Sequence, residues 1–243
     1  MAAQAEPDGY TLMLANTSTL VIGPAVYKNA DYDPVRSFAP IALVSRVPFV
    51  LGIAATVPAN TLKEFIAEVR AAPGKFNFGG GTGSPPHVMG AWFHHLNNLT
   101  VNHIPYRGGA QAVGDVIGGH IDMFYGGLAA ARSAIASGAV KALAVTGDAR
   151  SATLPDVPTY KEAGIEDGDL SSWTVMFAPK GAPAEVVALL RQETVAATAD
   201  PKIREVFAAL GVEPSATQDV RAFLAQEREK YGRVLRELAI KME

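Results

Sequence analysis

A glycine-rich turn joins a strand pattern to a helix start in the sequence Lys75-Phe76-Asn77-Phe78-Gly79-Gly80-Gly81-Thr82-Gly83-Ser84-Pro85-Pro86-His87. The alternating aromatic residues Phe76 and Phe78 predict a short strand, and the apolar run after Pro85-Pro86 predicts a helix. Glycine lets the backbone approach a ligand, and Ser84 can cap the helix. We expect free N–H groups in the first helical turn to favour a carboxylate, a phosphate or a polar neutral group.

A second interpretation of this turn stays open, because ordinary connections between strands and helices are also rich in glycine. The run from Gly79 to Ser84 contains neither the Gly-Lys-Ser/Thr of a Walker A loop nor a GxGxxG dinucleotide fingerprint. The turn taken alone therefore predicts a strand-to-helix connection without naming its ligand.

Comparable turns follow other predicted strands. The buried strand Thr11–Ala15 ends in Asn16-Thr17-Ser18-Thr19, a later strand ends in Tyr106-Arg107-Gly108-Gly109, and the strand Ile121–Tyr125 ends in Gly126-Gly127. Ligands bind at such strand ends in open α/β sheets, although hydroxyls and amides there equally serve as helix N-caps. Strand, turn and helix alternate through residues 75–146, which predicts a mainly parallel sheet.

The rest of the chain supplies further elements. Thr61-Leu62-Lys63-Glu64 forms a capping box that opens a helix through Arg70. Pro40 and Pro48 interrupt a long β segment, which indicates either a strand that passes between two lobes or an edge strand. Other patterns predict a surface loop at Asp31–Pro34, a strand at Trp173–Pro179, and helices from Pro183 to Thr198, from Pro201 to Leu210 and from near Gln218 to Glu237.

Composition restricts the class of protein. The chain has 243 residues, of which 49% are hydrophobic and 19% charged, and this balance is typical of a globular α/β protein. A net charge of −3 without a basic cluster disfavours nucleic-acid binding. The absence of cysteine removes thiol catalysis, cysteine-ligated zinc and disulfides. The sequence contains no apolar run long enough to cross a bilayer, and Met1–Asp8 shows no signal-peptide pattern.

No motif for catalysis, a cofactor or a metal emerges. The chain lacks G-x-S-x-G and H-E-x-x-H, so a hydrolase that uses Ser84 with His87 is the minor alternative to a binding protein. His87, His94 and His95 do not have a carboxylate at the spacing of zinc-ligand patterns, and His94 and His95 point to different faces of a helix. We expect no enzyme activity, no cofactor and no metal.

Several short motifs, in order from Pro7 to the C-terminus, resemble the extracytoplasmic solute receptors of tripartite tricarboxylate transporters, also called Bug-type receptors. Together these motifs are specific, although each alone is not. They are Pro7-Asp8-Gly9-Tyr10-Thr11-Leu12, Tyr32-Asp33-Pro34-Val35, Phe38-Ala39-Pro40, Pro73-Gly74-Lys75, His103-Ile104-Pro105-Tyr106-Arg107-Gly108, Lys141-Ala142-Leu143-Ala144-Val145-Thr146, Leu154-Pro155-Asp156-Val157-Pro158-Thr159 and Ser172-Trp173.

The resemblance implies a type II periplasmic-binding-protein-like α/β fold with mainly parallel sheets in two lobes joined by two crossing strands. Lobe one would comprise residues 1–45 and 147–243, and lobe two residues 46–146. A cleft between them would capture a small carboxylate or related metabolite in the periplasm for the membrane components of the transporter. The implied ligand-binding residues are Asn16, Thr17, Ser18, Thr19, Gly81, Thr82, Gly83, Ser84, His87, Tyr106, Gly126, Gly127 and Trp173.

Two departures from the family pattern affect this expectation. Family members usually begin about 50 residues earlier, with a signal peptide and the first strands of lobe one. An incomplete first lobe would expose apolar edges, so self-association through that lobe is predicted. Without an export signal, a cytoplasmic ligand-sensing module of the same fold is the alternative. The second departure is Gly126-Gly127, which stands where the family often has a polar Asp-Asn pair and which disfavours an amino acid or a polar dicarboxylate as ligand.

Overall fold

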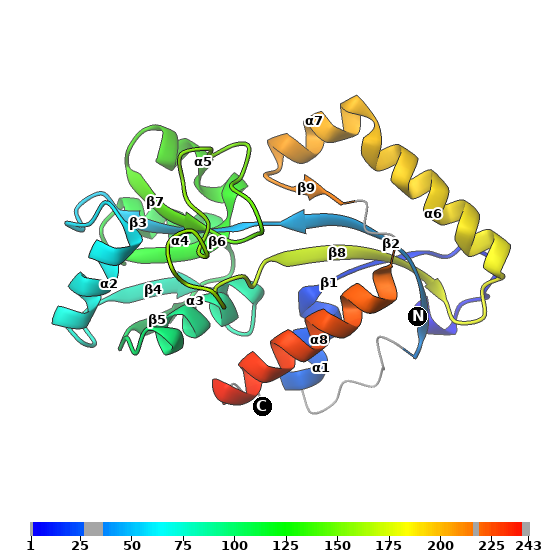
Figure 1. Cartoon of the computed structure of the whole chain (residues 1–243), viewed down its shortest axis with the longest axis horizontal. Helices are drawn as coiled ribbons and strands as arrows, with labels where there is room; N and C mark the ends of the chain where they lie inside the picture. Colours follow the sequence, from blue (N-terminus) through cyan, green and yellow to red (C-terminus); the bar gives the residue numbers. More distant parts are fainter. Residues whose placement is uncertain (1, 27–35, 216–218, 240–243) are drawn as a thin grey trace. The chain divides into compact units, whose positions relative to one another are not determined.

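The computed structural model describes residues 2–26, 36–215 and 219–239 (Figure 1). The chain divides into unit 1, Met1–Val47 with Ser172–Glu243, and unit 2, Pro48–Ser171. It passes from one unit to the other between Val47 and Pro48, and again between Ser171 and Ser172. The predicted Asp31–Pro34 loop, the Tyr32–Val35 motif and the helix start near Gln218 fall outside the described residues.

Unit 1 is built on an antiparallel sheet with the strand order β1-β8-β2-β9. Its strands are β1 (Met13–Asn16), β8 (Ser172–Pro179), β2 (Phe38–Val47) and β9 (Glu213–Pro214). Its helical segments are η1 (Ala2–Gln4), the π-helical η2 (Ser18–Ile22), α1 (Gly23–Val26), α6 (Ala184–Ala199), α7 (Pro201–Ala209) and α8 (Val220–Glu237). The bounds of the long helices α6 and α8 are close to those predicted from the sequence, which confirms these two helices.

The core of unit 1 follows from periodicity in β8 and α8. Trp173, Val175 and Phe177 alternate along β8 and are buried, as a strand with one covered face requires. On α8, Phe223 and Tyr231 lie on the buried face. The Trp173 ring meets the edge of Phe223 with centroids 5.3 Å apart, so α8 is packed directly on β8.

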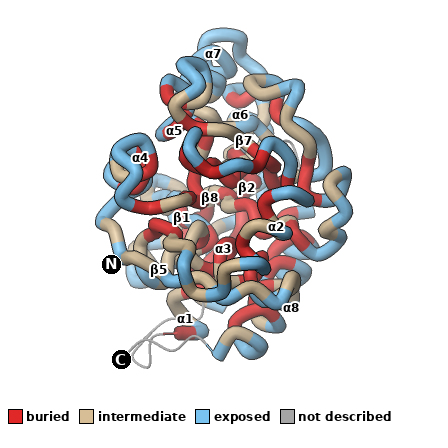
Figure 2. The backbone as a smooth tube through the Cα atoms, turned by 90° about the vertical axis from the view of Figure 1, so that its left-hand side faces the viewer, coloured by how far each residue is buried: buried red, intermediate tan, exposed pale blue. Residues whose placement is uncertain are grey.

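Unit 2 contains a mixed sheet with the order β5-β4-β6-β3-β7. Its strands are β3 (Phe49–Ala54), β4 (Asn77–Gly80), β5 (Asn102–Pro105), β6 (Met123–Gly127) and β7 (Val140–Val145), and its helices are α2 (Leu62–Ala71), α3 (Pro85–Leu96), α4 (Gly109–Ile117) and α5 (Leu128–Ala136). Figure 2 shows buried backbone concentrated along the strands and the inner faces of helices, while the outer helical turns are exposed. Thr61 Oγ1 accepts from Glu64 N–H at 3.2 Å, which confirms the predicted start of α2.

The prediction of mainly parallel sheets is wrong. In the described residues only the pairs β4–β5 and β4–β6 are parallel. The alternation of strand and helix does place β4, β5, β6 and β7 in one direction, but β3 inserts between β6 and β7 and runs against both. All side chains of β3 are buried, so this strand is favoured in the middle of the sheet rather than at an edge.

The boundary of the second unit also differs from the expectation. Residues 147–171, which the resemblance placed in lobe one, make their contacts within unit 2. Thr159 forms a parallel bridge with Val145, and the Tyr160 ring meets Phe93 with centroids 5.7 Å apart. The Trp92 indole N–H donates to the Asp167 carbonyl at 2.9 Å. The return to unit 1 therefore lies at Ser171–Ser172, where β8 begins.

Candidate functional site

The parallel strands of unit 2 bring three of the predicted turns to one edge of the sheet. Gly79 and Gly80 of β4 are in register with Ile104 and Pro105 of β5, and Gly79 is in register with Phe124 of β6. Because the carboxyl ends of parallel strands meet at one edge, the Gly81–Ser84 loop, Tyr106 and Gly126-Gly127 are neighbours there. This edge precedes the N-termini of α3, α4 and α5.

The loop before α3 uses most of its own donors. Ser84 N–H donates to the Gly81 carbonyl at 2.9 Å, and Gly83, in the left-handed region at φ +69°, donates to His87 Nδ1 at 3.1 Å. His87 N–H donates to Ser84 Oγ at 3.5 Å. Pro85 and Pro86 have no N–H. The expectation that the first turn of α3 presents free donors is therefore wrong, and within the described loop the N–H groups of Gly81 and Thr82 lie outside these internal bonds.

At this edge of unit 2, the helices that begin without a side-chain cap are α4 and α5. Their N-cap residues, Gly108 and Gly127, have no side chain, so neither helix receives a side-chain capping bond. A Cβ placed on Gly109 would lie 3.6 Å from Ala130 Cβ, which puts the first turns of the two helices in contact. Each uncapped N-terminus carries unpaired N–H groups and about half a positive charge. Two such termini side by side favour a carboxylate without any cationic side chain.

The sequence predicted one half of this pair. Gly126 and Gly127 were expected to bind the ligand, although without the polar side chains that the family often has there, whereas Gly108 was identified only as part of a turn with Arg107. A usable signal was present, because a glycine that directly precedes a helix leaves its first donors uncapped. What the sequence does not show is that the two helix starts touch.

A group of aromatic and histidine rings lies under the α3 loop. The His87 and His103 rings stack with centroids 4.0 Å apart, and Phe78 packs against both. His103 Nε2 donates to the Gly80 carbonyl at 2.9 Å. Burial and then the neighbouring His103 lower the pKa of His87 to about 4, and burial lowers the pKa of His103 against the opposing hydrogen bond to Gly80. His103 did not stand out in the sequence.

The other histidines of α3 and Tyr106 have structural partners. Burial lowers the pKa of His94 to about 3, and its Nε2 lies 2.9 Å from the Tyr125 hydroxyl. The Tyr106 hydroxyl donates to Asp115, and burial together with this carboxylate raises the pKa of Tyr106 to about 12. No group of three His, Asp or Glu side chains in the described part of the chain is arranged to hold a metal ion.

The predicted residues of unit 1 divide into a turn and a buried pair. Asn16 Oδ1 accepts from Thr19 N–H at 3.2 Å, so Asn16 caps the helical turn that begins at Ser18. Thr17 is fully buried, and its hydroxyl accepts from Trp173 N–H at 3.1 Å. Trp173 is also buried, and its indole N–H donates to Glu227 at 2.7 Å. The side chains of Thr17 and Trp173 are therefore used within unit 1.

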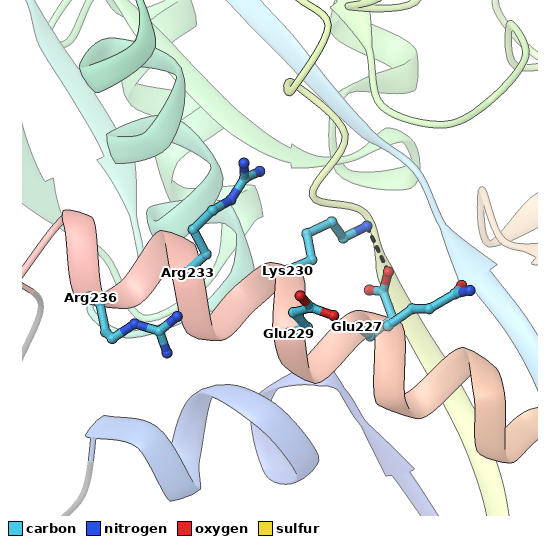
Figure 3. Close-up of a pocket in the computed structure, with 6 residues that line it drawn as sticks. Glu227, Glu229, Lys230, Arg233 and Arg236 are labelled. Atoms are coloured by element: carbon cyan, nitrogen blue, oxygen red, sulfur yellow. Dashed lines mark ion pairs between the residues drawn. The ribbon is translucent and has the colours of Figure 1, made fainter.

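Unit 1 also has a pocket of about 500 Å³ beside α8, which the sequence did not indicate. Figure 3 shows Lys230 reaching back to Glu227, and the two form an ion pair at 2.6 Å. The remaining labelled lining residues are Glu229, Arg233 and Arg236. This pocket mixes both signs of charge, whereas the edge of unit 2 offers backbone donors together with one exposed cationic side chain, Arg107, next to the N-cap Gly108. In the described residues no helix has the length and apolar character needed to span a membrane.

Mixed α/β sheets with open backbone donors at a strand edge are compatible with a protein that binds a small solute. The chain belongs to the tripartite tricarboxylate transporter family receptors, whose family model matches residues 1–240. The family is one of solute-binding receptors, as the sequence motifs predicted.

Named relatives agree with this assignment. Protein BugT of Bordetella pertussis is 32% identical over 244 residues, which cover 99% of this chain and 75% of that protein. The structure of periplasmic binding protein BugD has a TM-score of 0.82 at 32% identity and covers 100% of this chain and 82% of its own. The structure of R. palustris Rpa4515 with adipate has a TM-score of 0.85 at 26% identity, with 99% and 81% covered. These similarities confirm the family and the two-lobed α/β class.

Proposed function

We propose that this protein is a periplasmic receptor that binds a small carboxylate and presents it to a tripartite tricarboxylate-type transporter. The observation that carries the proposal is the contact between the uncapped N-termini of α4 and α5, joined by Gly109 and Ala130. These termini supply N–H donors and positive potential without a guanidinium or ammonium group. A related protein solved with adipate and another described as periplasmic support the ligand class and the location.

Other residues would complete the site around these helix starts. In unit 2, the N–H groups of Gly81 and Thr82 and the end of β6 at Gly126 adjoin the same sheet edge. Within unit 1, the turn Asn16-Thr17-Ser18-Thr19 is a separate ligand-binding candidate, through its backbone and the side chain of Ser18, because the Thr19 hydroxyl is bonded to Asn16 Oδ1 at 3.4 Å. We assign Thr17 and Trp173 structural roles because their polar atoms are engaged and buried.

The geometry around Ser84 favours binding over hydrolysis. In a serine hydrolase, the serine hydroxyl would be bonded to an imidazole nitrogen of its base. Here Ser84 Oγ accepts from the backbone N–H of His87, while the imidazole Nδ1 accepts from Gly83 N–H. Both groups are occupied in holding the loop, which supports a receptor without enzymatic activity.

A thermal-shift screen of mono-, di- and tricarboxylates, amino acids and aromatic acids tests the proposed function. A ligand that binds only the folded chain stabilises it by RT ln(1 + [L]/Kd), about 2.7 kcal/mol at a hundredfold excess over Kd. We expect one class of carboxylate, with adipate as the first probe, to raise the melting temperature. An absence of any shift across the carboxylates, confirmed by calorimetric titration, would contradict the proposal.

We also propose that a second copy of the chain pairs along β1. This strand is an edge of the unit 1 sheet, and Tyr10 and Leu12 just before it and Leu14 within it are 93%, 40% and 62% exposed. From Gly9 to Val26 the sequence contains no charged residue. Edge strands normally use charges, proline or bulges to avoid pairing with other chains, and β1 has none of these. An antiparallel edge is complementary to itself under two-fold symmetry, which favours a second copy as its occupant.

A further inference from the structure

The loop Gly81–Ser84 is held at both ends by an imidazole, and the two imidazoles come from different elements. His103 on β5 donates through Nε2 to the carbonyl of Gly80, the residue that immediately precedes the loop, at 2.9 Å. His87 on α3 accepts at Nδ1 from the N–H of Gly83, near the end of the loop, at 3.1 Å. The two rings stack with their centroids 4.0 Å apart, so the two attachments of the loop are in direct contact.

The bond to His87 satisfies a donor that has no other acceptor in the loop. Gly83 is the residue that turns the chain, with φ +69°, and its N–H points at the imidazole. The internal bond from Ser84 N–H to the Gly81 carbonyl closes only the turn itself. The His87 side chain therefore ties the turn to the first helical turn of α3, while its ring is supported by Phe78 of β4.

The direction of the bond fixes the charge and tautomer of His87. A ring nitrogen that accepts an N–H carries no proton, so the ring is neutral with its proton on Nε2. Protonation at Nδ1 would remove the acceptor that Gly83 N–H uses in the described structure. The rings that pack against His87 in the described structure are His103 from β5 and Phe78 from β4, and Phe78 also packs against His94 of α3. None of these is an acid that would stabilise a charged His87, and its lowered pKa agrees with this arrangement.

We propose that His87 is a positioning residue for the ligand, which acts through its Nδ1 bond to Gly83 to hold the Gly81 and Thr82 N–H groups in their binding arrangement, with His103 fixing the other end of the loop. The part that concerns ligand affinity rests on the proposed receptor function. The part that concerns the loop does not, because the Gly83 hydrogen bond is formed between two residues of the chain itself.

Two substitutions test the hydrogen-bond acceptor of His87 and its aromatic ring independently. His87→Phe retains an aromatic ring to stack on His103 and removes the acceptor. His87→Asn removes the ring and retains an oxygen near the position of Nδ1. The readouts are the amide-proton exchange and chemical shift of Gly83 by NMR at pH 7, and the affinity for adipate by calorimetry. Melting curves confirm that each variant is folded.

We expect Gly83 to exchange at least tenfold faster in His87→Phe than in the unmodified chain, and to stay protected in His87→Asn. Adipate affinity should fall at least tenfold in His87→Phe and be largely restored in His87→Asn. Equal Gly83 exchange in the unmodified chain and His87→Phe would overturn the proposal, as would unchanged affinity in a variant whose Gly83 amide has become exposed. If the unmodified chain does not bind adipate, the exchange data still decide the role of His87 in the loop, and only the proposed function is then in question.

Discussion

An aspartate at the N-cap of α4 should exclude a carboxylate ligand while stabilising the empty protein. Gly108 has φ −170° and ψ 160°, an extended conformation that any residue adopts, and a Cβ placed there meets nothing within 4 Å. In Gly108→Asp, the new carboxylate can accept from the first N–H groups of the helix. The cap contributes a few tenths of a kcal/mol over glycine, and the charge at the helix N-terminus adds about 0.3–1 kcal/mol. The melting temperature should rise by a few degrees at this chain length.

The same carboxylate would repel the ligand. An anion bonded to the first N–H groups of α4 would lie about 4 Å from it, where two like charges repel by about 1 kcal/mol in bulk water and about 4 kcal/mol at an effective dielectric constant of 20. At 1.4 kcal/mol per factor of ten, adipate affinity should fall roughly fivefold to a thousandfold. Gly108 is exposed, so the loss should shrink as salt is raised.

Two matched variants isolate the cause in Gly108→Asp. Gly108→Asn caps the helix without a charge, so it should stabilise the fold by a few tenths of a kcal/mol and weaken binding only by competing for donors. Gly108→Ala neither caps nor repels. Calorimetric titration with adipate at low and physiological salt, with melting curves of the free proteins, measures both effects. Unchanged adipate binding in a correctly folded Gly108→Asp protein would refute the assignment of the α4 N-terminus as the anion site.

Three further outcomes are expected. Tyr160→Phe should raise the free energy of unfolding in urea by about 1 kcal/mol, because the buried Tyr160 hydroxyl has no hydrogen-bond partner in the described structure. Tyr125→Phe should lower that free energy by about the same amount, because it breaks the hydrogen bond to His94. The pKa of His94 is lowered to about 3, so its contribution to stability is complete above pH 6.5 and declines as the pH falls towards 3. In His94→Gln, the free energy of unfolding in urea should therefore depend less on pH between pH 7 and 4.5. The same pH dependence in the variant and the unmodified chain would contradict this. In sedimentation experiments, Leu14→Lys on the β1 edge should shift the chain to monomer. The control Val206→Lys, at a comparably exposed apolar residue on α7, should not. If the unmodified chain is already a monomer, pairing along β1 is refuted.

The local elements of this fold were predictable because their signals are contained in short segments. The capping box at Thr61 and the proline at the start of the helix after Asp200 act through neighbouring residues, and both helices begin where those residues indicate. The direction of strand pairing was not predictable in this way. β3 comes from a segment outside the βα alternation, and its burial on both faces draws it between β6 and β7. Strand direction depends on that distant pairing and not on local pattern.

The same distinction applies to the candidate site. Ser84 was recognised as a helix cap, and the structure confirms the capping bond. Trp173 was assigned to the ligand through the resemblance, yet its indole N–H is bonded to Glu227, which lies far away in sequence. His103 was missed because a lone histidine on a strand has no local signature. Its role depends on the His87 ring, which the fold brings into contact with it.

The two glycine caps connect stability to binding. A side chain at Gly108 or Gly127 that satisfied the first N–H groups of α4 or α5 would stabilise the free protein and occupy the place of an anion. Leaving both caps empty forgoes that stability, and under the proposed function a bound carboxylate would restore it by acting as the missing cap of both helices at once. The ligand would then be a structural element of unit 2 as well as a solute. On this argument, a carboxylate should protect the first turns of α4 and α5 from hydrogen exchange more than it protects α3, whose cap Ser84 already provides.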